Sequence, residues 1–294
     1  MNNRTSTAIL AAIIAAGVAF GTAKFTASTS SSGPKASTGT MEKVISSGVI
    51  RCGYVPYPPG LIKDPNTGKI SGIFAEVLEK AGGNLGLKVE WTEEVGWGTM
   101  VEGLNAGRYD MIGSPVWPTS ERVRVADFTE AVYYGGVEVF VRADETRFDA
   151  KLGNLNDPKF KIATIEGEAA ATIAEQDFPK AGRISLPQMT DLSQLILNVV
   201  DSKADITFVD PVIAKQFMDK NPGKIKPLSP GNPIRLYPNV LMLKQSDHAF
   251  RRVLNLSIAD LQNNGFVDKV ISKYEPYPNA FYRNAKPIQS SATN

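Results

Sequence analysis

Cysteine and histidine are almost absent from this chain of 294 residues. Cys52 is the only cysteine and His248 the only histidine. One cysteine excludes an internal disulfide. His248 stands at what is expected to be the exposed start of a helix, so no Ser–His or Cys–His pair is expected near it, and no group of His, Cys and carboxylate residues has metal-ligand spacing. Cys52 lies in an apolar stretch and is expected to be a small buried core residue. The sequence therefore predicts no metal, no cofactor and no catalytic residue.

The chain also lacks a large net charge of either sign. The chain has 32 basic and 30 acidic residues, interspersed, and a formal net charge of +2. Without long basic runs there is no electrostatic footprint for a nucleic acid or another polyanion. The hydrophobic content of 43% is that of an ordinary globular protein, and the length favours two lobes.

The two ends of the chain differ from the rest in composition. Arg4 precedes a continuous apolar run over residues 8–20, and small residues follow. We interpret residues 1–23 as an export signal, because the run is shorter than the ~20 apolar residues of a membrane span. Residues 21–23 bring its length close to that of a span, so an uncleaved N-terminal anchor is the alternative. Residues 24–40 are rich in Ser and Thr and predict a flexible linker, and residues 276–294 predict a C-terminal tail. The chain is thus expected in the periplasm or outside the cell, with membrane tethering as the alternative.

Strand-like and helix-like segments alternate from Met41 onward. This alternation implies βαβ units and a mostly parallel sheet. Gly82-Gly83 are expected to end the first long helix, and Asp191 and Asp210 to cap later ones. The expected strands are 50–55, 87–91, 111–112, 162–165 and 204–209; the expected helices are 73–81, 100–104, 168–175, one after Asp191, one from Pro211, 250–261 and 265–274.

Two extended segments separate the two series of strands and helices. They cover residues 135–142 and 239–243. Two such segments that flank an inserted α/β unit predict a two-stranded hinge. The space between the two lobes is then the expected place for a ligand.

One stretch points to the capture of an anion. The apolar run Asp110–Ser114 enters a turn, and Thr119-Ser120-Glu121-Arg122 follows it. The arginine stands where a helix could begin, so a permanent cation is expected beside free backbone N–H groups. Such a place could receive a small carboxylate. The alternative is a surface ion pair of Arg122 with Glu121 or Asp127.

Six motifs follow one another along residues 41–274: Gly53–Pro59, Gly68–Ile73 with Glu76, Leu104–Asp110, Thr119–Phe128, Ala204–Asp210 and Gly265–Val270. In this order they resemble the amino-acid-uptake type of extracellular solute-binding proteins, family 3, which serve ATP-binding-cassette (ABC) importers. The resemblance implies a two-lobed α/β clamshell of the periplasmic-binding-protein-like type 2, with a two-segment β hinge. Residues 41–138 plus 242–275 would form lobe 1, and residues 139–241 lobe 2.

In that family the residue that matches Arg122 holds the carboxylate of the ligand, and the one that matches Asp210 accepts its ammonium group. The resemblance implies these roles here, although Asp210 could also be a plain N-cap ahead of Pro211. The ligand-binding residues expected in this way are Arg122, Asp210, Tyr57, Trp117, Glu168, Ser114, Ala169 and Thr119. Tyr54 and Trp97 are further wall candidates.

The chain departs from the family pattern where hydroxyl groups usually meet the ligand. Trp117 and the pair Glu168-Ala169 replace them, and Val55 stands where an acid is common. These changes put a standard α-amino acid in doubt. Trp117 could stack on the ligand or be a core aromatic residue. Glu168 could contact the ligand or only favour its own helix end.

The resemblance implies a binding protein rather than an enzyme. Its ligand would be a small amino acid or a related carboxylate or zwitterion, its partner a membrane permease, and its state a monomer. Two alternatives stay open: an exported cyclohexadienyl-dehydratase-like enzyme with Glu168 as general acid, and the ligand-binding domain of a sensor or receptor. The sequence does not identify the ligand.

Overall fold

The computed structural model describes residues 39–148 and 152–284. The predicted export signal, most of the linker and the last ten residues of the tail lie outside the described residues. Within the described ranges, no helix is long and apolar enough to cross a membrane.

Helices and strands alternate through the described residues as the sequence predicts. Cys52 is fully buried in the first strand, as expected. The helices are α2 Thr40–Ser47, α3 Ile73–Asn84, α4 Met100–Ala106, η1 Arg122–Arg124, η2 Leu152–Leu155, α5 Ala169–Asp177, α6 Ser193–Val200, α7 Pro211–Lys220, α8 His248–Asn263 and α9 Phe266–Tyr274. The strands are β1 Val49–Tyr54, β2 Ile62–Lys63, β3 Ile70–Ser71, β4 Lys88–Glu94, β5 Met111–Val116, β6 Ala126–Phe128, β7 Tyr133–Arg142, β8 Lys161–Ile165, β9 Gly182–Leu186, β10 Ile206–Val209, β11 Ile225–Pro227 and β12 Arg235–Lys244.

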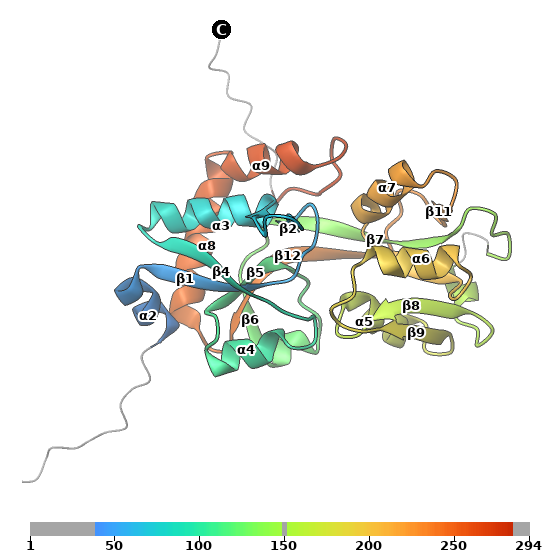
Figure 1. Cartoon of the computed structure of the whole chain (residues 1–294), viewed down its shortest axis with the longest axis horizontal. Helices are drawn as coiled ribbons and strands as arrows, with labels where there is room; N and C mark the ends of the chain where they lie inside the picture. Colours follow the sequence, from blue (N-terminus) through green and yellow to red (C-terminus); the bar gives the residue numbers. More distant parts are fainter. Residues whose placement is uncertain (1–38, 149–151, 285–294) are drawn as a thin grey trace, which may run out of the picture. The chain divides into compact units, whose positions relative to one another are not determined.

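The strands form two groups that share β7 and β12. Their order is β4-β1-β5-β12-β7-β10-β8-β9, with β6 paired to β12 and β11 paired to β7. Pairing is parallel for β1 with β4 and β5, and for β8 with β9 and β10. We call the group around β1 lobe 1 and the group around β8 lobe 2. Figure 1 shows β7 and β12 running from one group to the other.

The two long strands change partners along their length. Tyr133–Val137 of β7 pair with Arg235–Asn239 of β12. Beyond this stretch, β7 continues beside β10 and β11, and β12 continues beside β5 and β6. Two antiparallel strands therefore connect the lobes, as the sequence predicted. The predicted residue bounds of each lobe stay a prediction.

Successive side chains along the strands of lobe 1 point to opposite faces of the sheet, and each face packs in its own hydrophobic cluster. Met111 and Leu243 face one hydrophobic cluster with α2, α3, α8 and α9. Ile112 and Met242, one position away, face a second cluster with Met100 of α4. This second cluster continues through aromatic residues into the core of lobe 2. Side chains of successive strand residues point to opposite faces, so both layers follow from the period of two.

Three local expectations differ from the structure. Helix α3 passes through Gly82 and Gly83 and ends at Asn84. A Cβ atom on Gly82 would lie 3.1 Å from both Leu87 O and Val89 Cγ2, so this position in the helix has little room for a side chain. Helix α6 has Leu192 as its N-cap, although Asp191 Oδ1 accepts a hydrogen bond from Ser193 N at 2.8 Å. The arginine of the anion-binding stretch lies in η1, a 3-10 turn of three residues, rather than in an α-helix.

The described part of the C-terminal tail packs into lobe 1 and onto the hinge. Phe281 is only 2% exposed, and its ring lies 4.6 Å from that of Tyr133. Tyr282 forms two backbone hydrogen bonds with Tyr134 of β7, of 2.8 and 2.9 Å. The tail therefore adds an antiparallel bridge at the start of a hinge strand, which the sequence did not predict.

Candidate functional site

A small cavity collects most of the residues expected to bind a ligand. About 180 Å³ in it is not filled by atoms, part of it open to solvent, and this space is too narrow for a water molecule, so a ligand would need the lining residues to move apart. Its wall comes from loops of lobe 1 and from the start of α5 in lobe 2. The lining residues are Tyr57, Trp97, Pro115, Trp117, Arg122, Glu168 and Ala169. Four of the seven other expected site residues thus lie at one place with Arg122: Tyr57, Trp117, Glu168 and Ala169.

Arg122 is buried and forms hydrogen bonds on two sides of this cavity. Its Nη1 donates to the carbonyl oxygen of Trp117 at 2.9 Å, and its Nη2 donates to that of Gly167 in lobe 2. Burial lowers the pKa of Arg122, while the negative charge of Glu168 opposes this effect. Arg122 is therefore a core cation, and the surface ion pair with Glu121 or Asp127 is not what the geometry shows.

Asp210 lies at the beginning of α7. It is the N-cap, and its Oδ1 accepts a hydrogen bond from Val212 N at 2.8 Å. Burial raises the pKa of Asp210 to about 7. The hydrogen bond from Val212 N opposes this rise, and the negative charge of Glu138 adds to it. A Cβ atom placed on Gly135 of β7 would lie 3.2 Å from Oδ2 of Asp210, so the carboxylate rests directly on the hinge strand.

Asp210 does not line the cavity itself, but its charge, like that of Glu168, acts on Tyr57. Burial raises the pKa of Tyr57, and the charges of Asp210 and Glu168 add to this rise. The two carboxylates therefore act on one phenol group from lobe 1. The structure places Asp210 and Arg122 around the same aromatic residues.

Three aromatic side chains of lobe 1 form the body of the cavity wall. Tyr57 meets Trp97 and Trp117 edge to face, with ring centroids 5.9 and 6.1 Å apart. The guanidinium carbon of Arg122 lies 5.7 Å from the ring centroid of Trp97. Tyr54, in contrast, packs against Trp91 in the other hydrophobic cluster and is not part of this wall.

Glu168 is the N-cap of α5 and is 6% exposed. Its Oε2 accepts a hydrogen bond from Ala170 N at 2.6 Å. Burial raises the pKa of Glu168, while that hydrogen bond and the charge of Arg122 act in the opposite direction. A carboxylate of the protein thus occupies the end of α5, next to Ala169.

Ser114 and Thr119 have partners within the protein. The Ser114 hydroxyl group accepts a hydrogen bond from Val55 N at 2.7 Å and donates one to Val55 O at 2.8 Å. It joins the end of β5 to the loop that carries Tyr57, and does not line the cavity. Thr119 Oγ1 accepts a hydrogen bond from Arg122 N at 3.4 Å, so it lies beside the arginine backbone.

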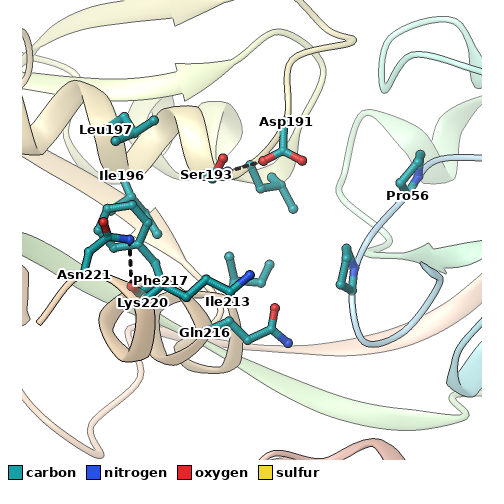
Figure 2. Close-up of a pocket in the computed structure, with 12 residues that line it drawn as sticks. Pro56, Asp191, Ser193, Ile196, Leu197, Ile213, Gln216, Phe217, Lys220 and Asn221 are labelled. Atoms are coloured by element: carbon teal, nitrogen blue, oxygen red, sulfur yellow. Dashed lines mark hydrogen bonds between the residues drawn. The ribbon is translucent and has the colours of Figure 1, made fainter. Parts of the chain in front are cut away.

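A larger groove lies between the loop that carries Pro56 and helix α7 (Figure 2). It contains about 1090 Å³ of space not filled by atoms, part of it open to solvent. Pro56 and Pro58 form one side, while Ile213, Phe217 and Lys220 of α7 lie on the other. Arg122 and Glu168, the buried charges of opposite sign, line the small cavity and, with Thr119, also a wider pocket that contains about 1200 Å³ of unfilled space, part of it open to solvent. We therefore place the candidate site around these two residues rather than in the groove.

Sequence reasoning missed the residues that hold the site together. Asn239 is 1% exposed and accepts a hydrogen bond from Trp117 Nε1 at 2.9 Å through its Oδ1. Gln188 of lobe 2 accepts one from Gly98 N at 2.9 Å. The partners are 122 and 90 positions apart. Only the position of Asn239 inside a predicted hinge segment hinted at such a role.

Comparison with known proteins agrees with this architecture. Residues 50–276 match the model of the bacterial extracellular solute-binding proteins, family 3. A probable amino-acid ABC transporter-binding protein of Haemophilus influenzae is 27% identical over 56% of this chain, and the chain spans 61% of that protein's length.

Two solved structures share the fold. An ancestral amino-acid-binding protein, a precursor of cyclohexadienyl dehydratase, has a TM-score of 0.70 and 22% identity, over 81% of this chain and 99% of its own. An ABC-transporter binding component from Wolinella succinogenes, in complex with lysine, has a TM-score of 0.69 and 22% identity, over 79% and 97%. The predicted two-lobed α/β fold is confirmed by these neighbours. This chain belongs to the bacterial extracellular solute-binding proteins of family 3.

Proposed function

We propose that this chain is the extracytoplasmic substrate-binding component of an ABC importer, and that it captures a small amino acid or a related zwitterion by closure of its two lobes. The observation that carries this proposal is the cavity itself. Trp97, Trp117 and Arg122 line it from lobe 1 and Glu168 from lobe 2, so both lobes must meet to complete it. A ligand that binds the closed arrangement more tightly shifts the population toward it, and a permease can recognise that difference.

In this proposal Arg122 pairs with a carboxylate of the ligand and Asp210 with its ammonium group. Both side chains are more than nine-tenths buried, so a bound ion would be largely desolvated. Tyr57 and Trp117, with Trp97, form the wall, while Ala169 and Glu168 close it from lobe 2. Ser114 and Thr119 position the loops. The lobes comprise residues 41–138 plus 242–275 and residues 139–241.

The remaining parts of the proposal concern where and how the protein works. Members of this family act outside the cytoplasm, and residues 1–23 would serve as signal or anchor for export. The partner would be the membrane permease, with the chain itself a monomer. We further propose that the chain performs no catalysis. Its one histidine is exposed on α8 and faces Asp127, at 3.5 Å, rather than the cavity.

Calorimetric titration with a panel of amino acids tests the function. The chain from Met41 onward should bind at least one member, and native mass spectrometry should show a one-to-one complex without conversion of the ligand. Arg122→Ala should weaken binding by about 2–5 kcal/mol, since it removes one partner of a buried charge pair. Arg124→Ala, on the exposed side of the same turn, is the matched control. Equal dissociation constants for Arg122→Ala and the unchanged protein would contradict the assignment.

A further inference from the structure

One arginine holds the end of the described chain to α9, and we call residues 275–284 the strap. Arg283 Nε donates a hydrogen bond to Asp268 Oδ1 of α9 at 2.7 Å, and its two Nη atoms donate to the two carboxylate oxygens of Glu275 at 2.9 and 2.8 Å. The side chains of Arg283 and Glu275 are only 16% and 9% exposed. A guanidinium group that binds a carboxylate through two hydrogen bonds makes a strong and directional contact. The strap is therefore anchored to lobe 1.

The strap is also attached to the beginning of β7. Tyr282 and Tyr134 exchange two backbone hydrogen bonds, of 2.8 and 2.9 Å. Phe281 packs against Tyr133, with ring centroids 4.6 Å apart, and both side chains are fully buried. On its other edge, this part of β7 pairs with β12. The first residues of β7 therefore lie between β12 and the strap.

This point of attachment lies where the hinge begins. Tyr133–Val137 of β7 pair with β12, and β7 then continues beside β10 in lobe 2. When two lobes rotate about a hinge, a few residues absorb the change in backbone torsion angles. Both the N–H group and the carbonyl oxygen of Tyr134 are bonded to Tyr282, so its backbone cannot rotate freely while these bonds are kept. The strap thus restrains one end of a hinge strand.

Strap residues are also close to the first turn of α7 in lobe 2. Val212 of α7 is fully buried in the same hydrophobic cluster as Phe281. Tyr277 of the strap is half-buried. Burial raises the pKa of Tyr277, and the negative charges of Asp210 and Glu138 add to this rise. Asp210 is the N-cap of α7, so the strap is near the elements that must move when the lobes separate.

We propose that the strap limits how far the two lobes can separate. Wide opening about β7 would have to break the backbone bonds between Tyr134 and Tyr282 or pull Phe281 out of its hydrophobic cluster. Without the strap, the equilibrium between arrangements of the lobes shifts toward more open ones. This role requires the two-lobed fold but no particular ligand, so failure of the proposed function would leave it standing.

Arg283→Gln tests the strap by releasing its anchor. Glutamine is uncharged and shorter, so it cannot hold both Asp268 and Glu275. Exchange of the Tyr134 amide hydrogen, measured by NMR, should become about tenfold faster or more. Small-angle X-ray scattering without added ligand should show a larger radius of gyration. Lys273→Gln is the matched control, since it removes an ion pair between α9 and Glu76 and leaves the strap contacts in place.

A reversible disulfide separates a limit on opening from a loss of stability. Two residues that exchange both backbone hydrogen bonds have Cα atoms about 5.5 Å apart, within the range for a disulfide. Tyr134→Cys with Tyr282→Cys would thus join the strap to β7 through two exposed positions. Cys52 is fully buried and should not interfere. When Arg283→Gln is added to this double variant, the radius of gyration should be larger in the reduced form than in the oxidised form.

The two forms of the triple variant decide the inference. A larger radius in the reduced form, with the oxidised form equal to the unchanged protein, supports it. Equal radii in both forms would overturn it, as would fast exchange of the Tyr134 amide in Arg283→Gln without any gain in radius. In both cases the tail would be only a packed chain end. Thermal unfolding followed by circular dichroism checks that both forms are folded at the temperature of the scattering measurement.

Discussion

Trp117 and Tyr237 form a stacked pair, with ring centroids 4.8 Å apart and planes inclined by 7°. Trp117 follows β5 in lobe 1, and Tyr237 lies in the part of β12 that pairs with β7. The indole N–H group of Trp117 also reaches Asn239, two residues farther along β12. One wall of the cavity is therefore attached directly to a hinge strand, so movement of this strand and the shape of the site are linked.

Replacing this indole ring should lower the stability of the protein. Trp117→Phe removes the N–H donor and leaves Oδ1 of Asn239 buried without it, which costs about 1–3 kcal/mol. Urea unfolding followed by circular dichroism measures the change. Trp91→Phe is the control. The indole N–H group of Trp91 donates a hydrogen bond to Glu79, which is exposed, so water can replace the lost donor in this variant. An equal loss in the two variants would contradict the role of Asn239.

Asp210 should make the empty protein less stable as the pH rises. Its pKa of about 7 lies above the ordinary value of 3.8, so between these values the folded state binds more protons than the unfolded state. The free energy of unfolding therefore falls as the pH increases from about 4 to 7, by up to about 4 kcal/mol from this group.

Asp210→Asn should remove this pH dependence while it keeps an N-cap oxygen for Val212. At pH 8 the variant should melt at a higher temperature than the unchanged protein, and near pH 4 the two should be alike. The variant should also lose the stabilisation that a bound ammonium ligand provides. Differential scanning calorimetry at both pH values checks this, and a lower melting temperature of the variant at pH 8 would refute it.

Closure of the lobes brings two glycines into contact. Gly167 has φ +74°, and a Cβ atom there would lie 2.7 Å from the backbone nitrogen of Gly98 in the other lobe. Gly167→Ala should thus oppose the closed arrangement and weaken ligand binding about tenfold or more. Small-angle X-ray scattering should show a smaller ligand-induced compaction. Gly153→Ala, where an added Cβ meets nothing within 4 Å, should behave like the unchanged protein.

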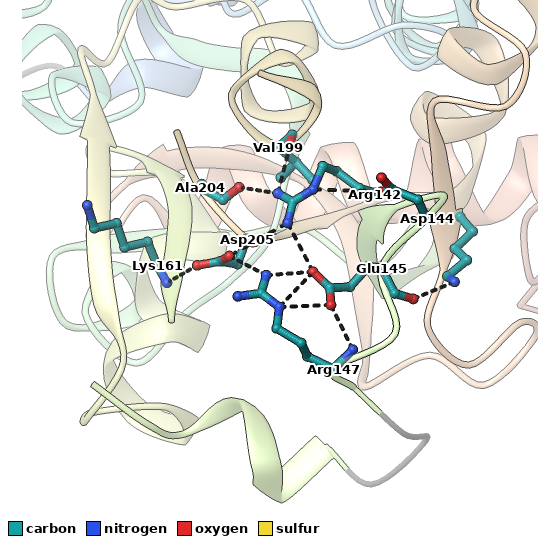
Figure 3. A network of polar contacts seen from close by, with 9 residues as sticks. Arg142, Asp144, Glu145, Arg147, Lys161, Val199, Ala204 and Asp205 are labelled. Carbon is teal, nitrogen blue, oxygen red and sulfur yellow. Dashed lines mark hydrogen bonds and ion pairs between the residues drawn. The ribbon is translucent and has the colours of Figure 1, made fainter. Parts of the chain in front are cut away.

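A network of charged side chains stabilises lobe 2 where β7 ends (Figure 3). Glu145 accepts hydrogen bonds from Arg147 and Arg142, and Arg147 also contacts Asp205 at 2.6 Å. The hydrogen bonds from Arg147, together with the nearby positive charges, lower the pKa of Glu145 to about 2. Because this pKa is depressed, the stabilisation is complete above about pH 4.5 and is lost as the pH falls toward 2.

Glu145→Gln should lower the free energy of unfolding at pH 7 by about 1–3 kcal/mol, because charged hydrogen bonds are lost in a buried place. The difference from the unchanged protein should shrink as the pH approaches 2. Asp201→Asn removes an exposed pair with Lys203 and should cost at most about 1 kcal/mol. Chemical denaturation at pH 7 and pH 3 measures both variants; a constant difference for Glu145→Gln would rule out the network as its cause.

Short-range features of the chain were sufficient for most of the fold. The alternation of strands and helices, the two extended hinge segments and the cap formed by Asp210 ahead of Pro211 all follow from neighbouring residues. Some predictions made from neighbouring residues were wrong, and at these places segments far apart in the sequence lie in contact. Gly82 and Gly83 do not end α3, and the backbone at Gly82 lies so close to Val89 of β4 that a Cβ atom there would be 3.1 Å from Val89 Cγ2. The tail contributes Phe281 to the core, which no local pattern indicated.

The sequence by itself determined the family, the α/β architecture, and Arg122, Asp210 and the aromatic residues as candidates. The tertiary structure alone decided which polar groups are already satisfied within the protein. Ser114 is bonded to Val55, 59 positions away, and Arg122 to Gly167, 45 positions away. The partner of a buried polar group is set by packing between distant segments, whereas periodicity and capping depend on residues within a few positions.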